Sequence, residues 1–329
     1  MKVIDFHTHI VPGQYPPRPP ACAEPSWPVM EKIDDRRSRM TIAGKPFRVF
    51  ESFYWDPAER LARLDEQEID LQVISPLPEL LSYWLAADAA ESLTDFMNEF
   101  VSGMVSSAPT RFAGMGCLVL QEPQRAVRQL ELLQKALGLR GVHVGSHVNG
   151  TSLADPRFYP VLEAAEALGL FVFVHGIKPG SAPQLLGPPL MPAVVGVPHE
   201  TAMTVSSFIM TDILGRFPRL KLVFSHGGGT IGSVIDRLNA VWKDFEVMRV
   251  VNMPPAQYVR RFWYDTAVFG ADYLAYLAGK FGADRLIAGT DGPASFGQPP
   301  VRELLAAAGL AVADRERIAY GNAAGLLNI

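Results

Sequence analysis

The amino-acid sequence predicts a single α/β domain folded as a (β/α)8 barrel of the TIM type. Short apolar runs alternate with amphipathic helices along most of the chain, and the runs number eight. Runs of this length that are apolar throughout indicate parallel strands buried on both faces of a sheet. Eight strand–helix units favour a closed barrel over a doubly wound open sheet.

The first strand is expected at residues 2–9. The other predicted strands cover residues 71–75, 112–118, 141–145, 170–175, 221–226, 262–266 and 285–290. The first helix is expected at residues 57–67, because Asp56 is a good N-cap and Pro57 suits the first turn. The later helices are expected near residues 88–107, 123–137, 158–168, 200–214, 230–245, 271–281 and 300–309.

One stretch departs from this alternation, an insertion at about residues 11–55. It is rich in proline, which blocks long helices and central strands. We expect a small hairpin near residues 40–50 and a role for the insertion as a lid or binding loop. Residues 179–198 are predicted to form a long loop over the barrel mouth. No repeat or flexible linker indicates a second domain, so residues 1–329 are predicted to form one metal-dependent barrel domain.

The composition narrows the class of protein. Apolar residues make up 48% of the chain and charged residues 19%, which is ordinary for a soluble protein. A net charge of -4 without a basic run argues against nucleic acid or an anionic membrane as partner. No apolar stretch is long enough to span a bilayer, and the first residues do not resemble a signal peptide. The two cysteines, Cys22 and Cys117, form no disulfide framework, which favours a cytoplasmic location.

Polar side chains stand where several predicted strands end. Because residues alternate between the two faces of a strand, the two histidines of the first strand project to the same side. Carboxyl ends of barrel strands meet at one rim, which is where active sites of such barrels lie. A lone histidine at a strand end is ordinarily structural, but a set converging on one rim predicts a metal centre. The set comprises His7, His9, His175, His226 and Asp291.

Three further histidines are less informative. His143 and His147 lie at or just past the fourth predicted strand and could line the pocket or support the metal ligands. His199 precedes a predicted helix and is expected at a helix start or on the surface.

These residues carry a resemblance to the amidohydrolase superfamily. Within it, the chain resembles the amidohydrolase-related branch typified by α-amino-β-carboxymuconate-ε-semialdehyde decarboxylase. The matching motifs run the length of the chain, and the His-Gly-Gly-Gly and Gly-Thr-Asp elements are the most specific. They are Asp5-Phe6-His7-Thr8-His9, Trp55-Asp56-Pro57 with Arg60, Leu61, Asp65 and Ile69-Asp70, Phe224-Ser225-His226-Gly227-Gly228-Gly229, Asp265-Thr266-Ala267, Gly289-Thr290-Asp291 and Gly321-Asn322-Ala323.

The resemblance implies one zinc ion bound by His7, His9, His175 and Asp291, with His226 beside it as general base. Neutral imidazoles and a carboxylate suit zinc, with manganese or cobalt as alternatives. A metal brings the pKa of a bound water toward neutrality, and a histidine could take or relay its proton. No lysine ends a strand where a bridging ligand would be needed, which favours a single metal. The three glycines after His226 either serve a tight turn or offer N–H groups to a carboxylate.

The resemblance also assigns two arginines to substrate binding. Arg48 falls in the insertion, and Arg237 lies about two turns into the helix after His226. In the family the equivalent arginines bind substrate carboxylates, the second from a neighbouring subunit, so a homodimer or higher homo-oligomer is expected. The alternative is that each is an ordinary surface arginine. Two positions depart from the family pattern, Gly176-Ile177 and Gly292-Pro293-Ala294, and they change the aromatic lining of the pocket.

The function implied is a zinc-dependent carboxy-lyase, a non-oxidative decarboxylase of a small unsaturated or aromatic carboxylic acid. Hydrolysis or hydration of a lactone, amide or activated double bond on the same centre is the alternative. A third reading, a non-catalytic barrel that binds a small acid, is disfavoured by the intact set of ligands. The substrate, the native metal and the oligomer size remain open at this stage.

Overall fold

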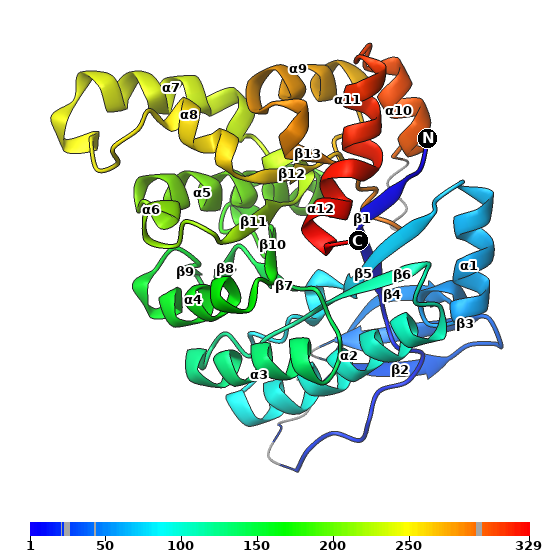
Figure 1. The fold of residues 1–329 in the computed structure, drawn as a ribbon. Helices are drawn as coiled ribbons and strands as arrows, with labels where there is room; N and C mark the ends of the chain where they lie inside the picture. Colours follow the sequence, from blue (N-terminus) through cyan, green and yellow to red (C-terminus); the bar gives the residue numbers. More distant parts are fainter. Residues whose placement is uncertain (21, 23–26, 43, 294–297) are drawn as a thin grey trace.

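The computed structural model describes residues 1–20, 22, 27–42, 44–293 and 298–329. Its main sheet has eight strands that pair in parallel in the order in which the chain forms them (Figure 1). They are β1 (Ile4–Ile10), β5 (Leu71–Pro76), β6 (Phe112–Gly116), β7 (Gly141–Gly145), β10 (Phe171–His175), β11 (Lys221–Phe224), β12 (Trp263–Asp265) and β13 (Leu286–Ile287).

The two edge strands of this sheet, β1 and β13, meet and close it. The Phe6 N–H donates to the Ala288 carbonyl at 2.8 Å, and the His9 N–H donates to the Gly292 carbonyl at 2.7 Å. Thr8 and Gly292 also form a parallel bridge. Closure removes the unpaired edges that an open sheet would expose. The predicted (β/α)8 barrel is therefore confirmed.

Each predicted strand overlaps an observed one, but the predictions for β6, β11 and β13 run past the observed ends of these strands. The prediction placed His226 inside a strand, whereas β11 ends at Phe224, and β13 ends at Ile287 rather than at residue 290. The backbone φ is 56° at His226 and 57° at Asp291, in the left-handed region that breaks strand pairing. These two candidate functional residues therefore lie in sharp turns just past the strands.

The predicted helices are all present, with small shifts at their ends. Asp56 caps the first of them as expected, because its carboxylate accepts from the N–H groups of Ala58 and Glu59 at 2.8 and 3.1 Å. The helices are α1 (Pro57–Glu66), α2 (Ala87–Ser107), α3 (Pro123–Lys135), α4 (Tyr159–Leu168), α5 (Val197–Met210), α6 (Ile213–Arg216), α7 (Ile231–Asp244), α8 (Pro255–Tyr258), α9 (Ala271–Phe281), α10 (Val301–Ala307), α11 (Val312–Glu316) and α12 (Asn322–Leu327).

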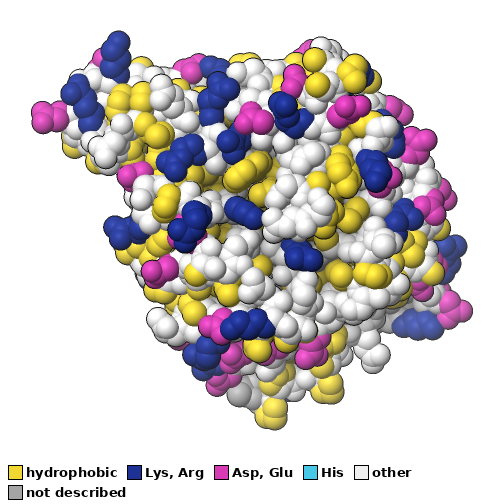
Figure 2. All heavy atoms as spheres, in the orientation of Figure 1, with side chains coloured by type: hydrophobic (Ala, Val, Ile, Leu, Met, Phe, Trp, Pro, Cys, Tyr) yellow, Lys and Arg dark blue, Asp and Glu magenta, His cyan; other side chains and the backbone are white. Residues whose placement is uncertain are grey.

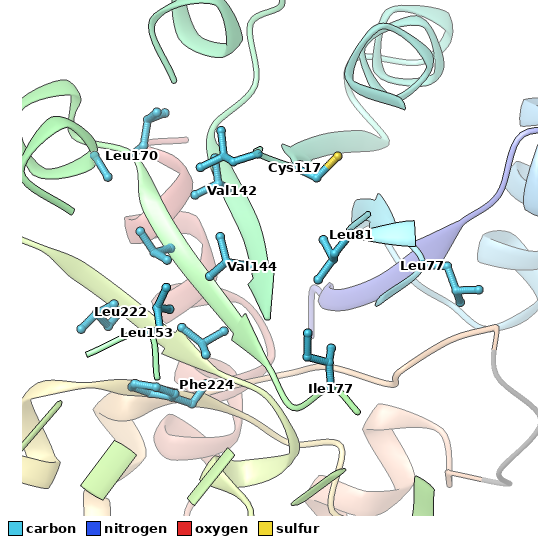
Figure 3. Close-up of a cluster of buried hydrophobic side chains, with 14 of the residues drawn as sticks. Leu77, Leu81, Cys117, Val142, Val144, Leu153, Leu170, Ile177, Leu222 and Phe224 are labelled. Carbon is cyan, nitrogen blue, oxygen red and sulfur yellow. The ribbon is translucent and has the colours of Figure 1, made fainter. Parts of the chain in front are cut away.

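Strand alternation builds two cores. Val142 and Val144 on β7 belong to the large core between the strands and the surrounding helices, which Figure 3 shows together with Leu222 and Phe224 of β11. A second core fills the barrel and contains Phe171 and other inward side chains. Helix α12, for which no element was predicted, contributes its apolar residues to this second core. It packs against β1 and lies beside it in Figure 1.

The predicted insertion contains a three-stranded antiparallel sheet of β2 (Val29–Lys32), β3 (Arg37–Ile42) and β4 (Lys45–Glu51). The expected hairpin corresponds to β3 and β4, and β2 was not predicted. Residues 21, 23–26 and 43 of the insertion lie outside the described residues.

The long loop predicted at residues 179–198 is only partly a loop. It includes a π-helical segment, Pro192–Gly196, and α5 begins at Val197 rather than at residue 200. Pro192 and Pro198 stand in the first turns of these segments, where a missing N–H removes no helical hydrogen bond.

The surface carries no obvious region of one charge in the view of Figure 2, where acidic and basic side chains intermingle over the visible face. Among the described residues, none of the helices combines the length and apolar character that crossing a membrane requires.

Candidate metal centre

The cluster begins at the carboxyl end of β1. His7 and His9 are 0% and 3% exposed, and their rings meet edge-to-face with centroids 5.0 Å apart. The pairing of β1 with β5 shifts register between Asp5 and Thr8, so the strand is irregular just where the histidines begin. Burial of two imidazoles side by side requires a partner for their polar nitrogens.

The partners come from the far end of the chain. His175 ends β10 and Asp291 follows β13, and each offers a ligand atom within 4.8 Å of those of His7 and His9. The Asp291 Oδ1 atom lies 3.2 Å from His7 Nε2 and 3.0 Å from His9 Nε2. The fold thus brings together all four residues that the sequence analysis assigned to the metal.

The hydrogen bonds of His175 indicate that this cluster is arranged for a cation. His175 Nδ1 lies 2.7 Å from the Gly176 carbonyl, which can only accept, so the ring proton stands on Nδ1. The Nε2 lone pair is therefore directed elsewhere, and this buried atom has no hydrogen-bond partner among the described residues. An unsatisfied lone pair beside a carboxylate and two further imidazoles fits a divalent metal.

The electrostatics of the cluster agree with this interpretation. Burial lowers the pKa of His9 to about 4, which keeps its lone pair available. Burial opposes ionisation of Asp291, but the charge of His7 and the hydrogen bonds from His226, His7 and His9 together outweigh it and hold the carboxyl pKa well below its usual range. Burial likewise lowers the pKa of His7, yet the carboxylates of Asp291 and Asp265 outweigh it and raise that pKa to about 10. The carboxylates of the site therefore favour a positive charge next to His7, and a bound divalent metal would supply it.

Asp265, at the end of β12, orients His7. Its Oδ2 atom lies 2.5 Å from His7 Nδ1, and its Oδ1 atom accepts from the N–H groups of Gly227 and Ala267. Such a carboxylate fixes the tautomer and the angle of a ligating imidazole. Asp265 belongs to one of the motifs shared with the family, but no role was predicted for it. The available signal was a carboxylate ending a strand, as histidines end the others.

His226 stands beside the cluster in the turn after β11. Its Nε2 atom lies 3.5 Å from Asp291 Oδ2, its Nδ1 atom lies 3.0 Å from Ser225 Oγ, and its ring is 4.7 Å from that of His175. Its position next to the ligands agrees with the predicted arrangement.

The three glycines after His226 serve the turn. Gly227, Gly228 and Gly229 donate their N–H groups to Asp265 Oδ1, the Ser225 carbonyl and the His226 carbonyl. A Cβ atom on Gly229 would lie 1.7 Å from the Pro198 carbonyl oxygen, and all three residues have positive φ. The alternative prediction, that these N–H groups bind a substrate carboxylate, is wrong because each is already bonded within the protein.

The centre opens into a space of about 170 Å³, here called the main cavity. Its lining joins the strand ends to the insertion and to the loops after β5 and β10. The lining residues with polar or aromatic side chains are His9, Arg48, Glu79, Ser82, Tyr83, Trp84, His147, Asn149, His175, Lys178, His226 and Asp291. A second space of about 450 Å³ adjoins His226 and Asp291 on the side of Thr230, Phe269 and Tyr273.

The two predicted substrate arginines differ in position. Arg48, on β4, lines the main cavity. Arg237 is exposed on α7 and lines neither of the two spaces just described. The structure of one chain therefore brings Arg48, but not Arg237, to the candidate site.

The three remaining histidines differ in their position relative to the cluster and the main cavity. His143 lies inside the barrel, with its ring stacked 5.5 Å from that of His9 and its Nδ1 atom 3.0 Å from the Pro76 carbonyl. His147 lines the main cavity, and His199 is exposed, as expected for a surface residue. His143 thus supports the cluster, while His147 belongs to the pocket.

The departures from the family pattern also fall at the site. Gly176 and Ile177 line the main cavity, and a Cβ atom on Gly176 would lie 2.1 Å from the Val197 carbonyl oxygen. Pro293 follows a cis peptide bond after Gly292. Ala294 lies outside the described residues.

A closed (β/α)8 barrel with His-x-His on its first strand and a histidine–aspartate cluster at the strand ends defines the class of amidohydrolase-type barrels. The chain belongs to the amidohydrolase family, whose model matches residues 4–329.

Individual relatives place it near decarboxylases. The chain is 33% identical to 2-amino-3-carboxymuconate-6-semialdehyde decarboxylase of Dictyostelium discoideum, over 90% of this chain and 82% of that protein. It is 29% identical to the solved structure of 5-carboxyvanillate decarboxylase from Sphingomonas paucimobilis, with a TM-score of 0.75 over 82% of each chain. The fold is also shared with a dihydroxybenzoic acid decarboxylase from Polaromonas sp. described with bound manganese, at 23% identity and a TM-score of 0.72 over 82% of this chain and 85% of that one.

Proposed function

We propose that this chain is a metal-dependent decarboxylase that acts without redox chemistry on a small unsaturated or aromatic carboxylic acid. The observation that carries the proposal is the buried cluster of His7, His9, His175 and Asp291, which opens with His226 onto a cavity containing Arg48. The names of the related proteins support the same reaction type.

The metal is proposed to be zinc, with manganese or cobalt as alternatives. Three neutral imidazoles and one carboxylate suit zinc in a four-coordinate site. Manganese in a protein of the same fold keeps that alternative open. When bound, a divalent metal polarises substrate oxygen atoms and stabilises negative charge that develops during the reaction.

The residues around the metal site have separate proposed tasks. Arg48 binds a substrate carboxylate, because the guanidinium fork matches carboxylate geometry. His226 is proposed to act first as general base and then to return the proton. If Nδ1 carries the hydrogen that Ser225 Oγ accepts, the Nε2 lone pair, on the side of Asp291, takes up a proton from water or substrate and the ring becomes an imidazolium. When the bond to the leaving carboxylate breaks, its electron pair stays on carbon, this proton forms the new C–H bond, and the ring returns to its neutral form.

The active unit is proposed to be a homodimer or a higher homo-oligomer. Arg237 is exposed and does not line the cavity of its own chain, which supports a role for it in a neighbouring subunit. We also propose a cytoplasmic location and a small carboxylic acid as substrate, with neither nucleic acid nor a membrane as partner, in keeping with the composition.

The test is release of carbon dioxide from a panel of muconate-type and hydroxybenzoate-type acids by zinc-loaded and manganese-loaded protein. The control is the same protein stripped of metal by a chelator. Release that depends on the metal supports the proposal and identifies the scaffold that is accepted. Metal occupancy without any release would contradict it and favour the hydrolase or hydratase alternative.

A further inference from the structure

Lys178 is a cation of the main cavity that neither the metal cluster nor the proposed proton transfer uses. It lies on the loop after β10, three residues beyond His175, and lines the cavity together with Arg48 and Glu79. Its ammonium group stands 4.6 Å from the centre of the Trp84 ring. Among the residues that the structure describes, Lys178 makes no ion pair, and Glu79 interacts with its charge only at longer range.

The backbone at Lys178 is held in an uncommon conformation. Its φ is 36°, in a region that non-glycine residues seldom adopt. Such conformations persist only where the surroundings enforce them, and they concentrate at ligand sites. The loop after β10 therefore presents this side chain at some conformational cost.

His147 supplies one of the contacts that enforce this conformation. Its Nδ1 atom accepts from the Gly150 N–H at 3.1 Å, so the ring proton stands on Nε2. Nε2 lies 3.2 Å from the Lys178 carbonyl oxygen and donates to it. His147 thus joins the loop after β7 to the loop after β10, and it fixes the backbone from which the Lys178 side chain extends.

The charges around the cavity favour an anion with more than one acidic group. Arg48 and Lys178 both lie in the lining, and Arg48 likewise has no ion pair among the described residues. Glu79 is an acidic side chain of the same lining, and burial raises its pKa, while Arg48 and Lys178 act against that rise. The two cations outnumber this acidic side chain, and a bound divalent metal would add positive charge, so an acid with two anionic groups balances the cavity better than an acid with one.

We propose that Lys178 is a specificity-determining residue that binds a second acidic group of the substrate, separate from the carboxylate that Arg48 binds. This inference rests on the proposed function, since it assumes that the main cavity is the substrate site. It narrows the substrate class to acids with two anionic groups carried on one flat scaffold, which can pack beside Trp84. Glu79 opposes the second anion and limits how tightly it binds.

The test compares two compounds that do not react, 4-hydroxy-3-methoxy-5-nitrobenzoic acid and 2-methoxy-6-nitrophenol, which differ only in one ring carboxylate. Their dissociation constants are measured by calorimetry on the metal-loaded protein. We expect wild type to prefer the acid by roughly tenfold or more, as a charge-assisted contact would provide. Lys178→Met should remove this preference without weakening the phenol, Lys178→Arg should retain part of it, and Glu79→Gln should increase it.

The matched control is Lys221→Met, at the amino end of β11 and therefore at the opposite end of the barrel, which should keep the wild-type preference. A Lys178→Met protein that still prefers the acid would overturn the inference, as would a wild type that binds both compounds equally or neither. Carbon dioxide release is measured on the same preparations. If wild type releases carbon dioxide and Lys178→Met still prefers the acid, only the role of Lys178 is overturned. If Lys178→Met loses the preference but wild type releases no carbon dioxide, only the decarboxylase assignment is overturned.

Discussion

The metal cluster and the opposite wall of the main cavity are built in different ways. The cluster uses strand ends and sharp turns next to them, its four residues are buried, and His7 and His175 are each oriented by a hydrogen bond through Nδ1. The opposite wall uses the insertion and loops, and its cations Arg48 and Lys178 have no ion pairs among the described residues. Rigid strands suit groups that must keep one geometry, whereas loops suit groups that adapt to a substrate. If the proposed roles hold, the strand ends determine the reaction type, and the insertion and loops determine the choice of substrate.

The largest expected effect concerns His226, which lies beside the cluster without belonging to it. His226→Ala should keep its metal and lose turnover by roughly a hundredfold to ten-thousandfold, the usual contribution of a positioned proton donor. Metal content by mass spectrometry and carbon dioxide release measure the two effects separately. The exposed His199→Ala should match wild type in both. Substantial turnover in His226→Ala would show that another group transfers the proton.

The second largest expected effect is a loss of metal affinity when Asp265 is replaced. Asp265→Asn keeps the oxygen that accepts from Gly227 and Ala267 but presents an amide to His7 Nδ1, which disturbs the tautomer. Metal affinity should fall by roughly tenfold to a hundredfold. Competition with a chromophoric chelator measures the affinity, and Asp272→Asn, exposed on α9, is the control. An unchanged affinity would show that His7 needs no orienting carboxylate.

A smaller effect is expected on the cavity wall. Arg48→Gln should raise KM by roughly tenfold with bound metal unchanged, because it removes a charge-assisted contact with the substrate and leaves the cluster intact. Arg39→Gln, on the neighbouring strand β3 and exposed, is the matched control. If Arg48→Gln instead lost its metal, the separation between the two regions would be wrong.

The last prediction tests whether the wall is completed by a second chain. Arg237→Ala and His226→Ala proteins, each of low activity, are mixed in equal amounts and allowed to exchange subunits. About half of the dimers are then mixed, and one of the two sites in each mixed dimer has both residues intact. The mixture should therefore recover roughly a quarter of the wild-type rate. Wild type mixed with buffer alone controls for dilution. No recovery after subunit exchange, shown by differently tagged chains, would leave Arg237 an ordinary surface arginine.

The amino-acid pattern predicts the cluster but not the conformation of the turn after β11 or the packing of helix α12. His226 was assigned to a strand because an apolar run leads directly into it, and periodicity cannot report a left-handed residue. The alternative role for the glycines failed because their N–H groups bond to Asp265 and to nearby carbonyls, contacts that depend on how the turn packs. Helix α12 was not predicted, since it is short and its burial in the barrel core depends on closure of the sheet.

The amino-acid pattern was enough to predict the barrel and the five polar residues that converge on its rim, and the family resemblance singled out four of them as metal ligands. Apolar runs of strand length predict parallel strands, and the carboxyl ends of parallel strands meet at one rim wherever the chain has placed them. Other relations can be seen only in the three-dimensional structure. Asp265 orients His7, and His147 holds the backbone of Lys178. Arg237 does not line the cavity of its own chain. These relations depend on the paths of turns and loops between residues far apart in the chain, and no local pattern in the sequence records those paths.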